Sequence, residues 1–411
     1  MRKAPPKAEY AGREAAFSFL VSALADHLHG RKTEPAADLD WEAFCRLVRA
    51  HQLAAVVYRQ CGSFLPDAAR AQLEKEYGAT LFVYANRTSD LQEIRAAFRA
   101  AELPLFSVKG LAVARYYPVP NLRSMGDCDL LIRPGDEEAA IAVMRSLGFR
   151  HDGEASKHAW TCVRAGRHFE LHSRLAEEDE YPDPRQSAFF NGYMSFTREG
   201  ELDWSFHFLF LLSHLRKHFL TNGVGVRQFF DLAVLIERGP VLDFTRIGEM
   251  TADLGLTGFA HACYSLIESW FGVTAPADFR RLAPADAAAV TEKIMSNGVF
   301  GFADAKNKYS AARRSFLRAG RPRWILRLSM LARRAFPGYS SMRTYPGCGY
   351  LDGRPWLLPA AWAHRFFSIL FRRDKRVQKE TLHSIFLPEG ELARQKELLR
   401  IMDLHGDPDK S

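Results

Sequence analysis

The stretch SVKGLAVARYYPVPNLRSMGDCDLLI, residues 107–132, places two aspartates one residue apart in a run that otherwise reads as a buried strand. Burying one ionised carboxylate is costly, and burying two on the same side costs more. Because side chains at i and i+2 share one face of a strand, Asp127 and Asp129 point together while Cys128 points into the core. These acids need a positive partner, and a hard divalent cation with oxygen ligands, most simply Mg²⁺, fits them.

The later segment HFELH, residues 168–172, repeats the alternation. His168, Glu170 and His172 fall on one face of a predicted strand. If this strand neighbours the first, Glu170 becomes a third carboxylate at the same site. Three carboxylates around one or two Mg²⁺ suit phosphoryl or nucleotidyl transfer, because charge on the moving phosphorus must be neutralised. The alternative is a solvated strand end with ordinary surface acids.

A lysine–glycine pair precedes the aspartates. Lys109 and Gly110 end a short apolar strand and open a predicted helix that runs to Pro118. Backbone N–H groups at such a bend can hold a phosphate, and Lys109 adds a charge. Arg123 could clamp phosphate oxygens, or it could form an ion pair with one of the aspartates that only holds the loop. Both interpretations remain open.

Composition indicates a soluble globular protein of two or three domains, with 411 residues, 47% of them apolar and 12% aromatic. The six cysteines have no CxxC or CxxH spacing, which favours reduced thiols over a disulfide framework or a structural zinc site. No apolar run reaches the ~18 residues of a membrane span. The N-terminal stretch around Phe17, Leu20 and Leu24 has the spacing of an amphipathic helix. We therefore expect a cytoplasmic protein.

The formal net charge of +8 is concentrated in one segment. Between Ala305 and Leu351 the chain has eleven Lys and Arg and no Asp or Glu, so the remainder is slightly acidic. A nucleic acid is one candidate partner for this segment, because its arginines are interleaved with aromatic residues. The arginines concerned are Arg313, Arg314, Arg318, Arg321, Arg323 and Arg327. An anionic protein or carrier, or no special partner, are the alternatives.

A predicted helix at residues 204–220 carries three histidines on one stripe, His207, His214 and His218. Zinc would need further ligands, and no acidic HExxH partner lies between them, so packing or hydrogen bonding is favoured. In the next predicted helix Arg227 and Asp231 lie at i and i+4, which predicts an intrahelical ion pair.

The quoted stretch, with FELHSRL (169–175) and the later segments HLRKH and GVRQFFDLAVL, resembles the uncharacterised bacterial nucleotidyltransferase family of the polymerase-β-like superfamily. That superfamily has a Gly-Ser turn after a strand, then two alternating aspartates, then a third acid on a later strand. The resemblance runs from about residue 40 to 370, and residues 105–175 are its specific part. Lys109-Gly110 stands where the superfamily has Gly-Ser. Lys-Gly is common in this subgroup and in the nucleotidyltransferase toxins, so no role is carried over from the serine.

The resemblance implies transfer of a nucleoside monophosphate from ATP or another NTP to an acceptor, with release of pyrophosphate and with two Mg²⁺ bound. It implies three acids as metal ligands and catalytic residues, namely Asp127, Asp129 and Glu170. The residues that it implies at the nucleotide are Lys109, Gly110, Arg123 and Ser124, with Gly110 as the turn glycine. Candidates for the acceptor side are His172, His218 and Asp231. The acceptor stays open: a small molecule, a peptide, a protein or an RNA.

We predict an α+β fold in which a minimal nucleotidyltransferase fold, a small mixed sheet with helices, is embedded between helical regions. The predicted parts are an N-terminal helical region (1–100), the α/β core (101–200), a helical domain (201–300) and a basic, aromatic-rich, helical C-terminal region (301–411). Asp40 and Asp90 are predicted helix caps, and Ala165-Gly166 a hairpin turn.

Three other functions stay open. The chain could be a silent family member that binds NTP or a partner without chemistry, although the intact set of acids argues against it. It could be a nucleic-acid-binding helical protein in which the α/β unit is only a scaffold. It could also be a phosphotransferase, because a metal site does not determine which phosphorus is attacked.

Overall fold

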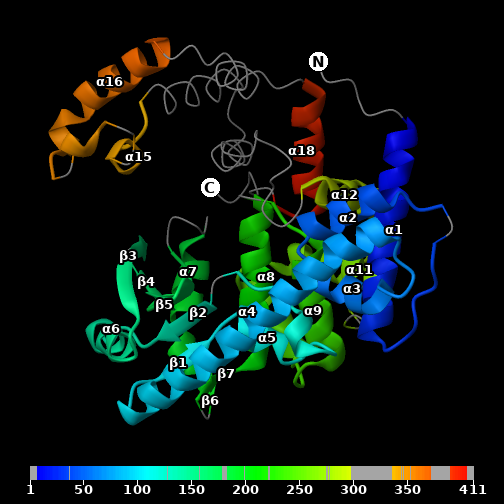
Figure 1. The fold of residues 1–411 in the computed structure, drawn as a ribbon, viewed down its shortest axis with the longest axis horizontal. Coiled ribbons are helices and arrows are strands. Elements are labelled where there is room, and N and C mark those ends of the chain that lie inside the picture. Colours follow the sequence, from blue (N-terminus) through cyan, green and yellow to red (C-terminus); the bar gives the residue numbers. More distant parts are fainter. Residues whose placement is uncertain are drawn as a thin grey trace. The chain divides into compact units, whose positions relative to one another are not determined.

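The protein is described from a computed structural model, drawn as a ribbon in Figure 1. The described residues are 7–36, 38–126, 128–156, 158–177, 183–198, 200–220, 223–274, 276, 278–297, 336–343, 345, 347–351, 353–371 and 389–404. The chain forms two compact units, residues 1–219 with 223–302, and residues 220–222 with 303–411.

The first unit begins with four helices, as the periodicity predicts. They are α1 (Lys7–Leu28), α2 (Trp41–Ala50), α3 (Ala54–Cys61) and α4 (Asp67–Ala100). Phe17, Leu20 and Leu24 of α1 are buried, which confirms the amphipathic interpretation. Asp40 caps α2 by accepting the N–H of Ala43 at 2.9 Å. The prediction of a cap at Asp90 is wrong, because Asp90 lies inside α4 and binds arginines of a neighbouring hairpin.

A small mixed sheet follows, as predicted. Its strands are β1 (Leu105–Ser107), β2 (Cys128–Ile132), β3 (Arg150–Ser156), β4 (Ala159–Arg164) and β5 (Arg167–His172). Their order is β1-β2-β5-β4-β3; β2 and β5 are parallel, and the other pairs are antiparallel. Ala165 and Gly166 join β4 to β5 with φ of +48° and +75°, the paired positive angles of a two-residue hairpin turn.

The helix after β1 is shorter than predicted. It is α5 (Gly110–Ala114), and it ends before Pro118. Beyond it the chain turns, and Tyr117 is buried with its hydroxyl on Asp231. The helix therefore ends three residues before Tyr117, whose partner Asp231 is distant in the sequence.

One face of the sheet packs on α4 and on α6 (Glu137–Ser146). Leu91, Ile94 and Phe98 of α4 share a core with apolar side chains of β2, β4 and β5, among them Cys128 and Leu130. Because side chains alternate along a strand, Asp129 and Glu170 are directed to the opposite face.

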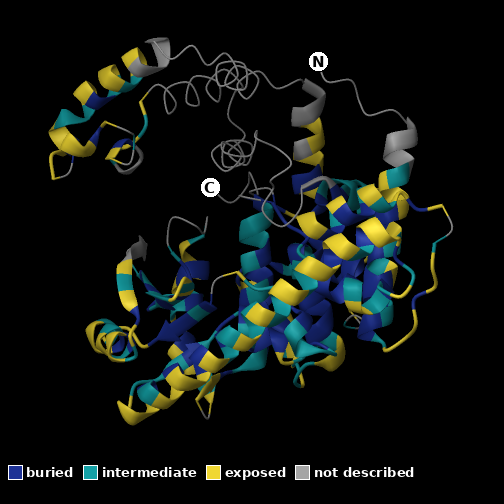
Figure 2. Cartoon of the chain, viewed as in Figure 1, coloured by how far each residue is buried: buried dark blue, intermediate teal, exposed yellow. Residues whose placement is uncertain are grey.

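Helices follow the sheet. They are α7 (Pro184–Asn191), α8 (Trp204–Leu220), α9 (Val226–Arg238), α10 (Phe244–Asp253), α11 (Thr257–Phe271) and α12 (Pro284–Asn297). A two-stranded ribbon, β6 (Thr197–Arg198) and β7 (Glu201–Leu202), precedes α8. Buried residues run along most of α9 and α11 (Figure 2). None of the described helices is both long enough and apolar enough to cross a bilayer.

The second unit contains α15 (Tyr339–Arg343), α16 (Leu358–Phe371) and α18 (Glu389–Ile401). Met342, Cys348, Leu351 and Ala361 form a small core in it. The arginines predicted to bind nucleic acid, Arg313 to Arg327, lie outside the described residues, and so does Asp127.

Candidate functional site

The two described acids of the predicted site are neighbours in the sheet. Asp129 of β2 and Glu170 of β5 are paired in register between these parallel strands. Ligand atoms of Asp129, Glu170 and His172 all lie within 4.8 Å of one another. The expectation that the FELH strand lies beside the first is therefore confirmed, and with it the convergence of these two acids.

The side chains of Lys109 and His172 both contact Asp129. The ammonium Nζ of Lys109 is 3.2 Å from the Oδ1 of Asp129, and the Nε2 of His172 is 3.1 Å from the same oxygen. Burial alone would raise the pKa of Asp129, but the charge of Lys109 and the hydrogen bond from His172 lower it well below its usual value.

His172 also contacts the second acid, with its Nε2 3.3 Å from the Oε2 of Glu170. Burial opposes the charged imidazole, yet hydrogen bonds to Asp129 and Glu170 raise the pKa of His172. The sequence assigns His172 to the acceptor side, whereas the structure places its ring on the acids.

The bend after β1 has an unusual backbone at Lys109, not at Gly110. Lys109 has φ +56° and ψ −124°, a conformation that glycine adopts most easily, whereas Gly110 begins α5. The Lys109 N–H donates to the Nε2 of His207 at 3.3 Å. The positive φ of this bend is therefore at Lys109, one residue before Gly110. This geometry directs the lysine side chain onto Asp129.

A cavity of about 310 Å³ brings most of the predicted site residues together. Those in its wall are Lys109, Gly110, Arg123, Asp129, Glu170, His218 and Asp231, joined by Leu211, His214 and Leu215 of α8 and by Arg227 of α9. Ser124 does not line it, because its hydroxyl donates to the carbonyl of Gln52 at 2.8 Å.

Arg123 binds a partner that the sequence did not suggest. Its Nε and Nη2 each donate to a carboxylate oxygen of Asp231 at 2.8 Å, and the hydroxyl of Tyr117 donates to the same group at 2.7 Å. Although burial opposes its charge, Asp231 raises the pKa of Arg123. The alternative of an ion pair between Arg123 and Asp129 is wrong, because the guanidinium lies on Asp231.

The predicted ion pair between Arg227 and Asp231 is also wrong. Both oxygens of Asp231 are occupied by Arg123, and Arg227 donates to the carbonyl of Ser124 at 2.7 Å. Helical spacing alone predicted the local pair, but a partner 108 residues away in the sequence replaced it.

The histidines of α8 form hydrogen bonds, the role that the sequence favoured over zinc binding. The Nε2 atoms of His214 and His218 are 2.8 Å apart, and His207 accepts from Lys109. Burial lowers the pKa of His218 to about 4, so its ring is neutral at pH 7. Among the described residues, Asp129, Glu170 and His172 form the group whose ligand atoms lie close enough together to hold a metal ion. Two carboxylates in such a group fit a hard cation.

A family comparison bears directly on this site. The sequence model of a family described as uncharacterised nucleotidyltransferases matches residues 37–272, more than half of the chain. The chain belongs to this family. The nucleotidyltransferase match extends from just before α2 to the end of α11, and so covers the whole sheet and the cavity wall. No curated protein and no solved structure matches the chain significantly.

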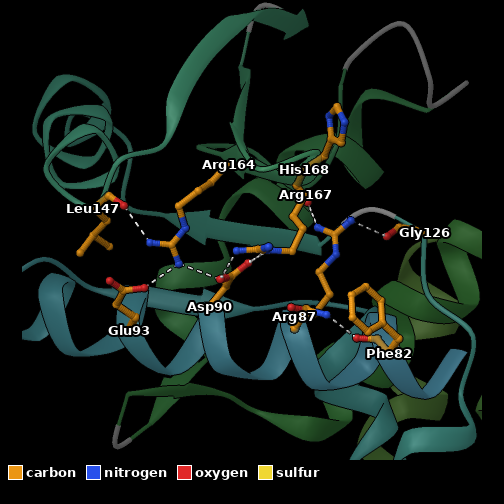
Figure 3. Close-up of polar contacts among 10 residues, drawn as sticks. Phe82, Arg87, Asp90, Glu93, Gly126, Leu147, Arg164, Arg167 and His168 are labelled. Atoms are coloured by element: carbon orange, nitrogen blue, oxygen red, sulfur yellow. Dashed lines mark hydrogen bonds and ion pairs between the residues drawn. The ribbon is translucent and has the colours of Figure 1, made fainter. Parts of the chain in front are cut away.

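Helix α4 supports the sheet from its buried face (Figure 3). Arg87 is buried and donates to the carbonyls of His168, two residues before Glu170, and of Gly126, which directly precedes Asp127 in the sequence. Sequence reasoning missed Arg87. A charged residue in register with the apolar stripe of a helix is the signal that could have found it.

One turn along α4, Asp90 binds two arginines of the β4–β5 hairpin (Figure 3). The Nη2 of Arg164 lies 2.7 Å from one carboxylate oxygen, and Arg167 donates to both. Burial would raise the pKa of Asp90, but these two arginines lower it. The carboxylate thus fixes the turn end of the hairpin to α4, three residues before Glu170.

Proposed function

We propose that the chain is a Mg²⁺-dependent nucleotidyltransferase that moves a nucleoside monophosphate from an NTP to a hydroxyl-bearing acceptor. The observation that carries this proposal is the pairing of Asp129 with Glu170 in the wall of a cavity that Lys109 also lines. Membership of the nucleotidyltransferase family supports it. ATP is the first NTP to test.

The proposed reaction forms one bond and breaks one. The acceptor oxygen attacks the α-phosphorus, and the bond from that phosphorus to the bridging α,β-oxygen breaks, so that pyrophosphate leaves. The acceptor's proton passes to a carboxylate at the site or to water. Lys109 is placed to bind phosphate oxygens, since its ammonium already lies at the acids.

Asp129 and Glu170 would hold the Mg²⁺, with Asp127 as a third ligand by the family pattern and two ions as the expected stoichiometry. Their carboxylates suit a hard cation, and the lowered pKa of Asp129 keeps that group ionised at neutral pH. When bound, Mg²⁺ would neutralise charge on the transferring phosphoryl group and favour loss of the acceptor's proton.

On the acceptor side we propose the wall formed by α8 and α9, with His218 and Asp231. His218 is neutral at pH 7, and Leu211 and Leu215 next to it are apolar. This wall therefore offers an acceptor hydrogen bonding and apolar contact. Asp231 acts through Arg123, which it binds.

The test uses NTPs labelled at the α- or the γ-phosphate, Mg²⁺ and cell extract. Wild type is compared with Asp129→Asn, Glu170→Gln and a control, Asp136→Asn. Asp136 is a matched control because its side chain is 14% exposed, as that of Asp129 is, and is also ion-paired, with Arg133.

We expect α-label in an acceptor with wild type and Asp136→Asn, together with pyrophosphate release. Labelling by Asp129→Asn and Glu170→Gln should fall by more than about 100-fold, since electrostatic stabilisation of this kind contributes roughly 10²–10³ to a rate. Transfer of γ-label instead would identify a phosphotransferase. Equal α-labelling by wild type and Asp129→Asn would refute the role of these acids.

A further inference from the structure

The cavity contains a partly buried arginine that has no carboxylate ion-pair partner among the described residues. Arg227 lies in the first turn of α9 and lines the same cavity as Asp129 and Glu170. Its Nε is buried and has no hydrogen-bond partner, and its Nη1 donates to the main-chain carbonyl of Ser124 at 2.7 Å. A carbonyl is a neutral acceptor. Taking part of a guanidinium out of water without an anion has a cost, so this arrangement favours a negative partner.

The other cations of the cavity wall already have carboxylates. Lys109 lies 3.2 Å from Asp129, and Arg123 binds both oxygens of Asp231. Asp231 also accepts from Tyr117, so it has little capacity for a further donor. In the part of the chain that the structure describes, no carboxylate forms an ion pair with Arg227.

The electrostatics of Arg227 agree with this geometry. Burial, and then repulsion from Arg123, lower the pKa of Arg227, although Asp231 opposes the shift. A guanidinium nevertheless stays protonated at neutral pH. An anion that enters the cavity would relieve both the burial cost and the repulsion.

We propose that Arg227 is a phosphate-binding residue of this cavity and contacts the polyphosphate chain of the nucleotide. The identity of the anion rests on the proposed function. Guanidinium N–H groups match phosphate oxygens in geometry and form charge-assisted hydrogen bonds with them. Arg123, to which the sequence analysis gave this role, has its guanidinium on Asp231. Ser124 acts indirectly, since its carbonyl positions Arg227.

The experiment compares wild type with Arg227→Met, Arg227→Lys and the control Arg123→Met. Calorimetry measures the affinity for inorganic triphosphate in the presence of Mg²⁺, and differential scanning measures the melting temperature of each ligand-free protein. Arg227→Met should weaken triphosphate binding about 10- to 100-fold, the loss expected for charge-assisted hydrogen bonds. Its ligand-free melting temperature should be retained or raised, because a partly buried charge without an ion-pair partner is replaced by an apolar chain.

The other two variants sharpen the comparison. Arg227→Lys keeps the charge and should bind triphosphate with an affinity between those of wild type and Arg227→Met. Arg123→Met leaves the buried carboxylate of Asp231 unpaired, so its melting temperature should fall.

The proposal is overturned if Arg227→Met binds triphosphate as wild type does. It is equally overturned if Arg227→Met loses as much thermal stability as Arg123→Met, since the arginine is then a structural element. A failure of the proposed function is separate from both. In that case wild type binds triphosphate, Arg227→Met binds it more weakly, and no α-labelled NTP yields a labelled acceptor.

Discussion

The guanidinium of Arg87 lies over the ring of Phe169, 5.2 Å from its centroid. Phe169 is the buried residue between His168, whose carbonyl accepts from Arg87, and Glu170. Arg87 also binds the carbonyl of Gly126, at 3.3 Å. One buried side chain therefore binds the backbone of β5 two residues before Glu170 and the backbone just before β2, the strand that carries Asp129.

Replacing Arg87 should disturb the acids more than it disturbs the fold. We expect Arg87→Lys, which can reach only one of the two carbonyls, to raise the Mg²⁺ concentration for half-maximal activity about 10-fold, the lower range for residues that orient metal ligands. A titration of activity against Mg²⁺ measures it.

Asp90→Asn on the same helix is the matched control for Arg87→Lys. This variant removes the charged acceptor of Arg164 and Arg167, and hydrogen bonds to charged groups contribute roughly 1.5–3 kcal/mol. The free energy of unfolding should therefore fall by about 2 kcal/mol, with the Mg²⁺ dependence unchanged. The same Mg²⁺ dependence in Arg87→Lys and wild type would show that Arg87 only supports the fold.

The backbone of Lys109 allows a test that separates strain from charge. A non-glycine residue at φ +56° costs about 1–3 kcal/mol, which glycine avoids. Lys109→Ala and Lys109→Gly should both lose most activity, because both lack the ammonium on Asp129. Lys109→Gly should be about 1 kcal/mol more stable than Lys109→Ala in urea unfolding. If the alanine variant is as stable as the glycine variant, the bend is not strained.

Much of the site could be predicted because its signals are local. Alternation along a strand is set by backbone geometry, and it put Asp129 and Glu170 on faces away from the core. The Ala165-Gly166 turn fixed β4 against β5. The sequence analysis could only assume that β2 pairs with β5, because no local signal specifies which strands are neighbours in a sheet.

The parts that sequence reasoning missed depend on distant partners. Arg123 and Asp231 are 108 residues apart, and no periodic pattern reports such a pair. The i, i+4 spacing of Arg227 and Asp231 favoured a local ion pair, which Arg123 displaced. Asp90 is of a residue type that often caps helices, but it binds Arg164 and Arg167 of the β4–β5 hairpin instead. In each case a long-range partner overrode a local preference.

The burial of His51 should make the free energy of unfolding depend on pH. His51 is fully buried, and its Nδ1 accepts the N–H of Val226 at 3.1 Å, so burial lowers its pKa to about 4. In the unfolded chain the pKa returns to about 6.5. The unfolded state therefore takes up the proton first as the pH falls.

The contribution of His51 to stability is thus complete above about pH 6.5, and up to about 3 kcal/mol of it is lost between pH 6.5 and 4. Denaturant unfolding over this range checks the slope. His51→Gln should flatten the slope, and an unchanged slope in that variant would assign the pH dependence to other groups.

The hydroxyl of Tyr117, next to the cavity wall, should contribute measurably to the free energy of unfolding. It is buried and donates to Asp231 at 2.7 Å, and hydrogen bonds to charged groups contribute about 1.5–3 kcal/mol. Tyr117→Phe keeps the ring that packs edge-on against Phe230, so it isolates this bond. We expect a loss of about 1.5 kcal/mol in unfolding free energy. A loss below about 0.3 kcal/mol would mean that Arg123 alone satisfies the carboxylate.

A crystal structure with Mn²⁺ and an NTP analogue that cannot be cleaved between the α- and β-phosphates would test whether Asp129 and Glu170 hold the metal. Anomalous scattering locates the ion without reference to the assumed site. We expect a peak within about 2.5 Å of carboxylate oxygens of both Asp129 and Glu170, in contact with the α-phosphate. A nucleotide bound with its phosphates and its Mn²⁺ away from these two residues would show that they are not the metal ligands.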